Sequence, residues 1–318
     1  MRKLILALII LNVLSVFLGL SIGSAINPAE SLYGLVHGKE TIKSLILNYR
    51  LPRTLTAMLV GASLSIAGCT MQAFFRNPLA DPYILGVSSG ASVGAALAIL
   101  LGIATTYNLI FMAFITSIAT ATLVYKLGKS AIIGESYGIL LAGIAVASFL
   151  SGLTAILIYM AGESMHKVVF WILGSFSNSK WEKFLFSAPI SCICIAYILI
   201  NSWKLNAILL GDEHAISVGL NVSRFRKRLV TVISLLTSSA VAISGVIGFV
   251  GIIIPHTMRL IVGESHQRLL ITTLFLGSAF MPIVDIIARS SISGELPIGA
   301  LTALIGAPFF VYLLRRGV

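Results

Sequence analysis

Long runs of apolar residues without a central charge recur along the whole chain, and short polar segments separate them. A helix of about 20 mostly apolar residues crosses a bilayer core about 30 Å thick. The long runs lie near residues 4–26, 54–75, 83–104, 107–125, 137–161, 184–203, 229–252, 269–288 and 297–314. A shorter apolar segment at 253–263 contains Pro255 and His256. The pattern predicts an all-α, polytopic membrane protein with about ten transmembrane helices in a single transmembrane domain, residues 1–318.

The composition supports this interpretation and leaves little room for a separate soluble domain. Of the 318 residues, 58% are hydrophobic and 10% are charged, whereas about a quarter of a soluble domain is charged. The three cysteines, Cys69, Cys192 and Cys194, all lie in apolar stretches. We therefore expect neither a disulfide framework nor a metal site.

The N-terminal segment has two interpretations. Met1, Arg2 and Lys3 precede the uncharged residues 4–29, which resembles a secretory signal with Gly23-Ser24-Ala25 as its cleavage site. The uncharged run is longer than a usual signal core, and the later spans need no cleaved leader. We therefore interpret it as the first transmembrane helix.

The net charge of +11 is explained by topology. If the N-terminus is cytoplasmic, ten spans place 14 of the 22 basic residues inside and leave eight outside, as the positive-inside rule requires. Those inside are Arg2, Lys3, Arg76, Lys126, Lys129, Lys204, Arg224, Arg226, Lys227, Arg228, Arg259, Arg268, Arg315 and Arg316. This predicts a multi-pass protein of the cell membrane with both termini cytoplasmic, and it requires no nucleic-acid partner.

Catalytic groups are scarce in the predicted spans. Asp285 is the exception, and we expect it to pair with Arg289 one turn later. The scarcity of carboxylates in the spans argues against an ion-coupled secondary transporter, which is the main alternative, and against a membrane enzyme. Gly128-Lys129-Ser130 resembles the end of a phosphate loop, but Leu123 replaces its first glycine. We expect no catalytic residue here, and any ATP must be hydrolysed by another subunit.

Two polar regions are candidates for partner contacts. Residues 204–228 form the longest polar interruption, where Asp212 can cap a short helix and Gly219 can end it. This segment is either a helix that docks on a partner or a solvated loop with a basic cluster. On the outer side, Arg50 and Arg53 flank Pro52 at a predicted helix start. They can face outward, toward carboxylates of a docking protein or toward lipid phosphates.

Small residues at helix-packing spacing predict a closely packed bundle. Examples are Gly19 with Gly23, Gly90 with Gly94, and the run Gly245, Gly248 and Gly251. Segments 51–62 and 296–307 share a Leu-Pro start and a Leu-x-Gly-Ala end. An internal repeat explains that likeness no better than chance and common helix-start chemistry do.

Several motifs together resemble one family. They are Leu51-Pro52-Arg53-Thr54, the stretch from Gln72 through Asn77-Pro78-Leu79-Ala80-Asp81-Pro82 to Ala91, Gly248-Phe249-Val250-Gly251 with Pro255-His256, and Glu295-Leu296-Pro297-Ile298-Gly299 to Pro308. In this order, and over nearly the whole chain, they resemble the permeases of iron-siderophore, haem and vitamin B12 ABC importers.

The resemblance implies a type II importer fold, a homodimer on two ATP-binding cassette ATPase subunits, and an extracytoplasmic substrate-binding protein docked outside. ATP is then used by the partner subunit, and this chain binds no cofactor. The resemblance also implies site residues. They are Leu210, Gly211, Asp212, Glu213, Ala215 and Gly219 for coupling to the ATPase, and Arg50, Arg53 and Arg289 for docking of the binding protein.

Ser136 and Tyr137 match the cytoplasmic gate of the family, although Tyr137 departs from the small hydroxyl residue of the vitamin B12 permease. Substrate is expected to enter an outward-open cavity between two subunits and to leave inward after ATP-driven closure. Ser63, Ser65, Ser148, Ser151 and Thr154 are candidate lining residues. The sequence does not distinguish a ferric siderophore, haem, cobalamin or an oxyanion as cargo, because selectivity rests largely in the binding protein.

Overall fold

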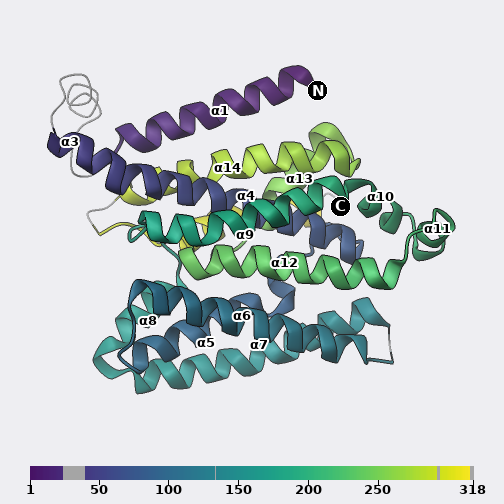
Figure 1. Cartoon of the computed structure of the whole chain (residues 1–318), viewed down its shortest axis with the longest axis horizontal. Coiled ribbons are helices and arrows are strands. Elements are labelled where there is room, and N and C mark those ends of the chain that lie inside the picture. The colour runs from purple at the N-terminus through teal and green to yellow at the C-terminus, as the bar shows by residue number, and fades with distance from the viewer. Residues whose placement is uncertain (24–39, 133, 292–293, 316–318) are drawn as a thin grey trace.

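The computed structural model describes residues 1–23, 40–132, 134–291 and 294–315, and these residues form helices and connecting segments without a β-strand. Figure 1 shows the arrangement. The long helices are α1 (Arg2–Ser21), α4 (Leu51–Phe75), α6 (Thr106–Lys129), α7 (Glu135–Met160), α9 (Trp181–Ile200), α12 (Val222–Ser244), α14 (His266–Ser291) and α15 (Ile298–Arg315). The shorter ones are α3 (Glu40–Leu45), α5 (Val87–Leu100), α8 (Met165–Ile172), α10 (Ser202–Leu209), α11 (Asp212–Ser217) and α13 (Val250–Val262).

The described helices confirm the predicted fold class. Seven are long and apolar enough to cross a membrane, counting Glu40–Phe75 as one continuous helix. Three shorter apolar helices, α5, α13 and the described part of α15, accompany them. Part of the first predicted span, and the cleavage site at Gly23-Ser24-Ala25, extend beyond the described residues.

α4 is the central helix of the bundle. Residues Val60 to Phe74, more than half of the helix, are all buried, and α4 packs against α9, α12, α13 and α14. A Cβ atom at Gly68 would lie 2.0 Å from the carbonyl oxygen of Gly251 on α13. The absence of a side chain therefore allows the two backbones to touch, as the small-residue pattern predicts. A second group of helices, α5 to α8, lies on the other side of α12 in Figure 1.

Two predicted spans differ from the observed helices. Residues 229–252 were expected to form one helix, but α12 ends at Ser244 and α13 begins at Val250. The break follows from left-handed backbone at Gly245 (φ +73°) and Phe249 (φ +68°), which no α-helix accommodates. Residues 83–104 were also expected to form one span. Instead a 3₁₀ turn at Pro82–Leu85 precedes α5, and Gly86 (φ +72°) separates the two.

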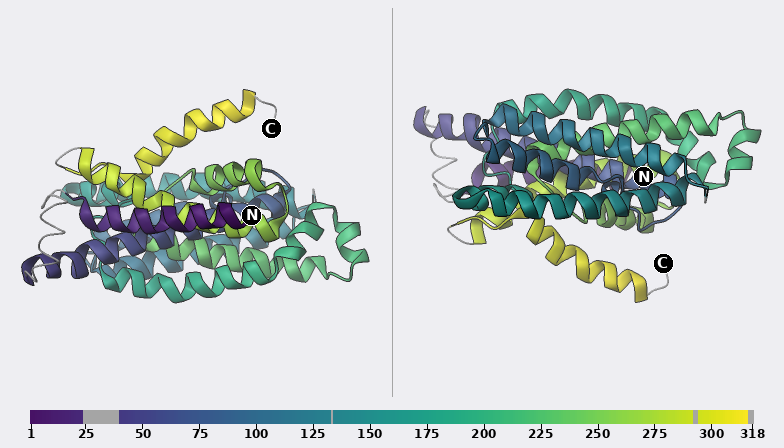
Figure 2. Two further views of the ribbon diagram at one scale, coloured as in Figure 1. Left: turned by 90° about the horizontal axis from the view of Figure 1, so that it is seen from above. Right: turned by 90° about the horizontal axis from the view of Figure 1, so that it is seen from below.

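The two ends of the bundle carry different predicted sites. Figure 1 shows α10 and α11 at one end, which we call the α11 end, and α3 and α8 at the opposite one, the α3 end. α1 starts on the side of the α11 end. α15 starts at the α3 end, where the N–H of Ile298 donates to the carbonyl of Gly174 at 3.0 Å. Figure 2 shows that α15 then diverges from the other helices.

Candidate coupling and docking sites

The predicted coupling segment, 204–228, lies at the α11 end, but its non-helical part is shorter than expected. α10 and α11 occupy most of residues 202–217, and α12 begins at Val222. Asn221 caps α12 by accepting a hydrogen bond from the N–H of Arg224 at 3.0 Å. The basic cluster Arg224–Arg228 therefore lies in the first turns of a long helix and is not a solvated loop.

Two glycines define α11. Gly211 precedes it with φ +120°, and Gly219 follows it with φ +83°. The N–H of Gly219 donates to the carbonyl of Ile216 at 2.9 Å, and the N–H of Leu220 donates to the carbonyl of Ala215 at 3.0 Å. These two bonds form a Schellman motif, which confirms that Gly219 ends the helix. A Cβ atom at either glycine would meet nothing within 4 Å, so backbone conformation and not space favours glycine there.

α11 presents an apolar surface at the end of the bundle. Leu210 is 71% exposed, Ile216 62% and Val218 49%, whereas Ala215 is fully buried. The exposed Glu213 lies on the same short helix. Exposed apolar side chains with a polar rim are typical of a protein interface. Of the two interpretations of this segment, the geometry favours a docking helix over a solvated loop.

Asp212 does not act as the expected helix cap. Gly211 is the N-cap residue, and the Asp212 carboxylate instead pairs with Arg76 at the end of α4 and with Arg226 of α12, the latter at 3.0 Å. Arg226 also pairs with Glu135, the first residue of α7, at 3.5 Å. These ion pairs connect α4, α11, α12 and α7 at the α11 end.

The predicted gate residues lie beside this network. Ser136 and Tyr137 directly follow Glu135 in the first turn of α7, where Ser136 is half-buried and Tyr137 is 70% exposed. Arg226 therefore joins α11 to the turn that carries both residues. Their role as a gate stays a prediction.

The three predicted docking arginines have partners inside the protein, and two of them are buried. Arg50 and Arg289 are each 5% exposed. Arg50 donates to the carbonyls of Leu20 and Ser21 at 2.7 and 3.0 Å, and Arg289 donates to the carbonyl of Gly19 at 2.8 Å. Both guanidinium groups thus bind the carbonyl end of α1, where positive charge is favourable.

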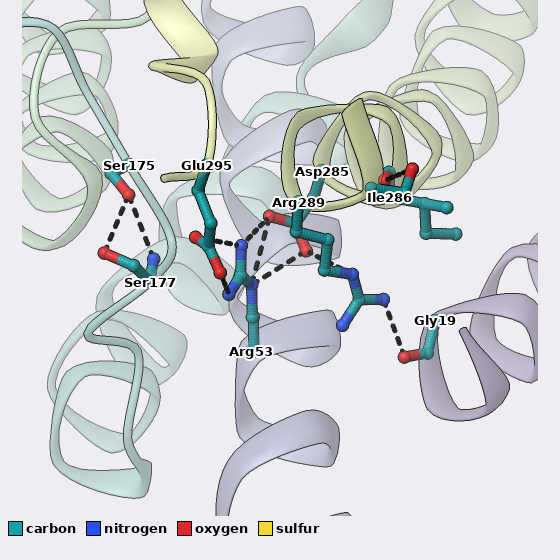
Figure 3. A network of polar contacts seen from close by, with 9 residues as sticks. Gly19, Arg53, Ser175, Ser177, Asp285, Ile286, Arg289 and Glu295 are labelled. Carbon is teal, nitrogen blue, oxygen red and sulfur yellow. Dashed lines mark hydrogen bonds and ion pairs between the residues drawn. The ribbon is translucent and has the colours of Figure 1, made fainter. Parts of the chain in front are cut away.

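Arg53 lies between two carboxylates (Figure 3). Its guanidinium pairs with Asp285 of α14 at 2.8 Å and with Glu295, which precedes α15, at 2.9 Å. Each carboxylate receives more than one hydrogen bond from Arg53, a geometry that strengthens charged pairs. Glu295 has left-handed backbone, φ +54°, and its side chain is 30% exposed.

One expectation about these residues is wrong, and another is confirmed but incomplete. Arg50 and Arg53 do not lie at a helix start facing outward, because Glu40–Phe75 is one continuous helix that passes through a π-helical turn at Ile46–Arg50. Asp285 does pair with Arg289, at 3.7 Å, but its closer partner is Arg53. Sequence spacing favoured the local partner, whereas packing of α4 on α14 supplies a nearer one.

The expected lining residues are only partly accessible. Ser148 and Ser151 are exposed on α7, but Ser63 and Ser65 are fully buried in α4 and Thr154 is 7% exposed. The hydroxyl of Ser63 donates to that of Ser191 on α9 at 3.1 Å. A cavity of about 650 Å³ opens instead at the α3 end, where His166, Lys167, Lys183 and Glu295 contribute to its wall.

The segment after α4 is held by polar contacts of Asp81 and Tyr83. The Asp81 carboxylate accepts a hydrogen bond from the N–H of Tyr83 at 2.7 Å, and the Tyr83 hydroxyl donates to the carbonyl of Ile247 at 2.9 Å. Burial raises the pKa of the Asp81 carboxyl to about 6. This segment joins the 3₁₀ turn before α5 to the break between α12 and α13.

Sequence reasoning missed four charged residues that organise the two ends. Arg76, Arg226 and Glu135 form the network at the α11 end, and Glu295 holds Arg53 at the other end. Arg76 and Glu295 stood within or beside motifs that the sequence singled out. No sequence pattern indicated that Arg76 pairs with Asp212, 136 residues away, or that Glu295 pairs with Arg53, 242 residues away.

Comparison with known proteins places these features in a family. The chain matches the FecCD transport family over residues 8–316. It is 39% identical to the cobalamin import system permease of Halobacterium salinarum over 276 residues, 87% of this chain and 74% of that protein. It is 36% identical to the molybdate import system permease of Haemophilus influenzae, covering 99% of this chain and 97% of the relative.

The fold has a close counterpart among solved structures. A structure described as an inward-facing conformation of a transporter assigned to the metal-chelate type of ABC transporter superposes with a TM-score of 0.89. The two chains are 35% identical, and the match covers 99% of this chain and all of the other. With near-complete coverage in sequence and structure, the chain belongs to the FecCD transport family of ABC importer permeases.

Proposed function

We propose that this chain acts as a homodimer that carries an iron chelate (a ferric siderophore or haem) or cobalamin across the cell membrane. Two ATP-binding cassette subunits drive the cycle, and an extracytoplasmic binding protein delivers the cargo. The chain itself binds no cofactor, and its partners hydrolyse ATP. The observation that carries the proposal is α11, whose apolar surface is exposed while Asp212, at its start, is ion-paired to Arg226.

The mechanism follows from the connections at the α11 end. Closure of the ATPase dimer displaces α11, because Leu210, Ile216 and Val218 are in its groove. The displacement passes through Asp212 and Arg226 to Glu135 at the start of α7. Movement of this turn shifts Ser136 and Tyr137 and opens the cytoplasmic exit. In this orientation the α11 end is cytoplasmic, and so are both termini.

An uptake assay tests the function. The chain is reconstituted in vesicles with its ATPase subunit and binding protein, and labelled ferric siderophore, haem, cobalamin and molybdate are supplied in turn. We expect ATP-dependent accumulation of one of the first three cargos. Accumulation without ATP hydrolysis contradicts the importer mechanism, whereas accumulation of molybdate alone contradicts the cargo class. A vesicle that lacks only the ATPase subunit is the control.

Two features support a homodimer. α7 has small exposed residues on one face, Ala145, Ser148 and Gly152, and such residues let two membrane helices approach closely. α15 diverges from the bundle (Figure 2), and its apolar Leu304 and Ile305 are exposed. Crosslinking between single cysteines introduced at Ser148, in a background without the three native cysteines, tests this contact. A dimer whose α7 helices stay uncrosslinked contradicts it.

The α3 end is the proposed docking face for the binding protein. Arg50, Arg53 and Arg289 provide three positive charges, but Asp285 and Glu295 already pair with two of them. Glu295 is the more exposed carboxylate, 30% against 1% for Asp285. In this proposal, an acidic residue of the binding protein replaces Glu295 on Arg53.

Glu295→Gln therefore strengthens docking, because Arg53 loses an internal competitor. We expect the affinity for the binding protein to rise about three- to tenfold at low salt, and less at high salt. Glu163→Gln, at an exposed position of the same end, removes the same charge and is the matched control. Unchanged or weaker binding by Glu295→Gln alone contradicts docking through Arg53, while leaving the transport function intact.

A further inference from the structure

A groove between α6 and α12 has no part in the transport mechanism described above. The two helices pack against each other, and the groove beside them has a volume of about 590 Å³. This is within the range of about 300 to 1,000 Å³ that is usual for ligand sites. Its floor consists of Ala121, Val230 and Ser234, each less than 7% exposed.

The groove runs along the membrane-spanning part of both helices. Its lining extends along α6 from Lys129 to Ile118 and along α12 from Lys227 to Leu235. At about 1.5 Å per residue, the α6 wall is about 16 Å long. That length is about half of a bilayer core about 30 Å thick, so the groove has the depth of one leaflet. A soluble protein docked at the end of the bundle does not reach its inner part.

The mouth of the groove is basic. Lys126 and Lys129 lie in the last turn of α6, and Lys227 lies in the second turn of α12. All three are exposed. Within the part of the chain that the structure describes, none of them has a carboxylate within 4.0 Å. The nearby Glu135 pairs with Arg226.

We propose that the groove between α6 and α12 binds one anionic phospholipid, with an acyl chain along the floor and its phosphate at Lys126, Lys129 and Lys227. The combination of a leaflet-deep apolar channel and three cations at the interface matches the two parts of such a lipid. The assignment to the inner leaflet rests on the orientation proposed above. Binding in detergent does not depend on that orientation.

Native mass spectrometry of the full chain in detergent tests the proposal. The purified protein is titrated with phosphatidylglycerol or with phosphatidylcholine of the same acyl chains. Each lysine contributes about fivefold to the binding of an anionic headgroup. We expect at least tenfold preference for phosphatidylglycerol, and its loss in K126Q/K129Q/K227Q. The matched control R2Q/K3Q/R268Q removes three exposed charges outside the groove and keeps the preference.

A second variant tests the acyl chain position. Thr231 lines the groove and is exposed, so Thr231→Trp fills the groove without disturbing the core. We expect it to lose phosphatidylglycerol although all three lysines remain. Retention by Thr231→Trp, or equal binding by wild type and K126Q/K129Q/K227Q, overturns the proposal. Displacement of the lipid by an equal concentration of glycerol phosphate also overturns it, because the site would then recognise a soluble phosphate.

A protein occupant gives a different result. Amine-reactive labelling of Lys126, Lys129 and Lys227 is compared with and without phosphatidylglycerol, and with and without the ATPase subunit. Protection by phosphatidylglycerol alone supports the lipid site. Protection by the ATPase subunit alone, or by dimerisation alone, means that the groove is a protein interface and refutes the lipid assignment.

Discussion

The ion pair between Arg226 and Glu135 tests how α11 communicates with α7. Their side chains are 10% and 20% exposed, and the closest nitrogen and oxygen atoms are 3.5 Å apart. At an effective dielectric constant of about 20, this separation gives a gross attraction of about 5 kcal/mol. Desolvation of both groups offsets most of it, so we expect a net coupling energy of about 1 to 2 kcal/mol.

The perturbation is a double-mutant cycle of Arg226→Met and Glu135→Gln. Methionine keeps much of the arginine stem that packs near Phe74, whose ring centre lies 5.7 Å from the guanidinium carbon. Asp212 keeps its second partner, Arg76, so the cycle does not leave that carboxylate unpaired. Arg224→Met removes an exposed arginine from the same helix and is the control.

The assay measures uptake and ATP hydrolysis in the same reconstituted vesicles. We expect each single variant to lower the amount of cargo moved per ATP about five- to thirtyfold, with little change in the hydrolysis rate. The double variant should move no less cargo per ATP than either single variant, because each single substitution already removes the whole interaction. If the two losses multiply, or if Arg224→Met has an equal effect, the pair does not transmit the motion of α11.

Three further predictions concern single positions. Gly211→Val should uncouple hydrolysis from uptake, because φ +120° strains a β-branched residue at the start of α11; normal uptake per ATP in vesicles would contradict this. Gly68→Val should lower the free energy of unfolding by about 3 kcal/mol or more, since its Cβ would lie 2.0 Å from a Gly251 oxygen. The control Gly248→Ala, whose Cβ would meet nothing within 4 Å, should unfold near the wild-type temperature in detergent. Asp81 has a folded pKa of about 6 against an ordinary 3.8, so its ionised form is disfavoured and the protein loses stability as pH rises through this window. Asp81→Asn keeps an acceptor for the N–H of Tyr83 but cannot ionise. It should therefore unfold at a higher temperature than wild type above pH 6 and at the same temperature below about pH 4. An equal difference in unfolding temperature at both pH values refutes the role of ionisation.

The helices followed from the sequence where hydrophobicity alone decides structure. Lipid excludes unpaired backbone groups, so apolar runs such as 107–125 and 137–161 had to be helical and agree with α6 and α7 within a few residues. Hydropathy does not show where a helix ends inside an uncharged run. Gly245 and Phe249 interrupt a run that contains no charged residue, and the prediction therefore extended one helix across two.

The candidate sites were predictable as locations but not as contacts. The glycine that ends α11 is a local signal, and Gly219 was correctly interpreted. The partners of Arg53 lie 232 and 242 residues away, so only the folded arrangement of α14 and the start of α15 brings them together. For the same reason the sequence suggested that Arg50 and Arg53 face outward, although both are satisfied within the bundle.

The carbonyl end of α1 has a consequence for biosynthesis. Arg289 reaches Gly19 across 270 residues of chain, and Arg50 reaches Leu20 across 30. At about 5 to 20 residues per second, the ribosome makes Arg289 roughly 15 to 55 seconds after Gly19. Until Arg289 of α14 has been synthesised, the carbonyl end of α1 therefore has only one of its two cationic partners, Arg50.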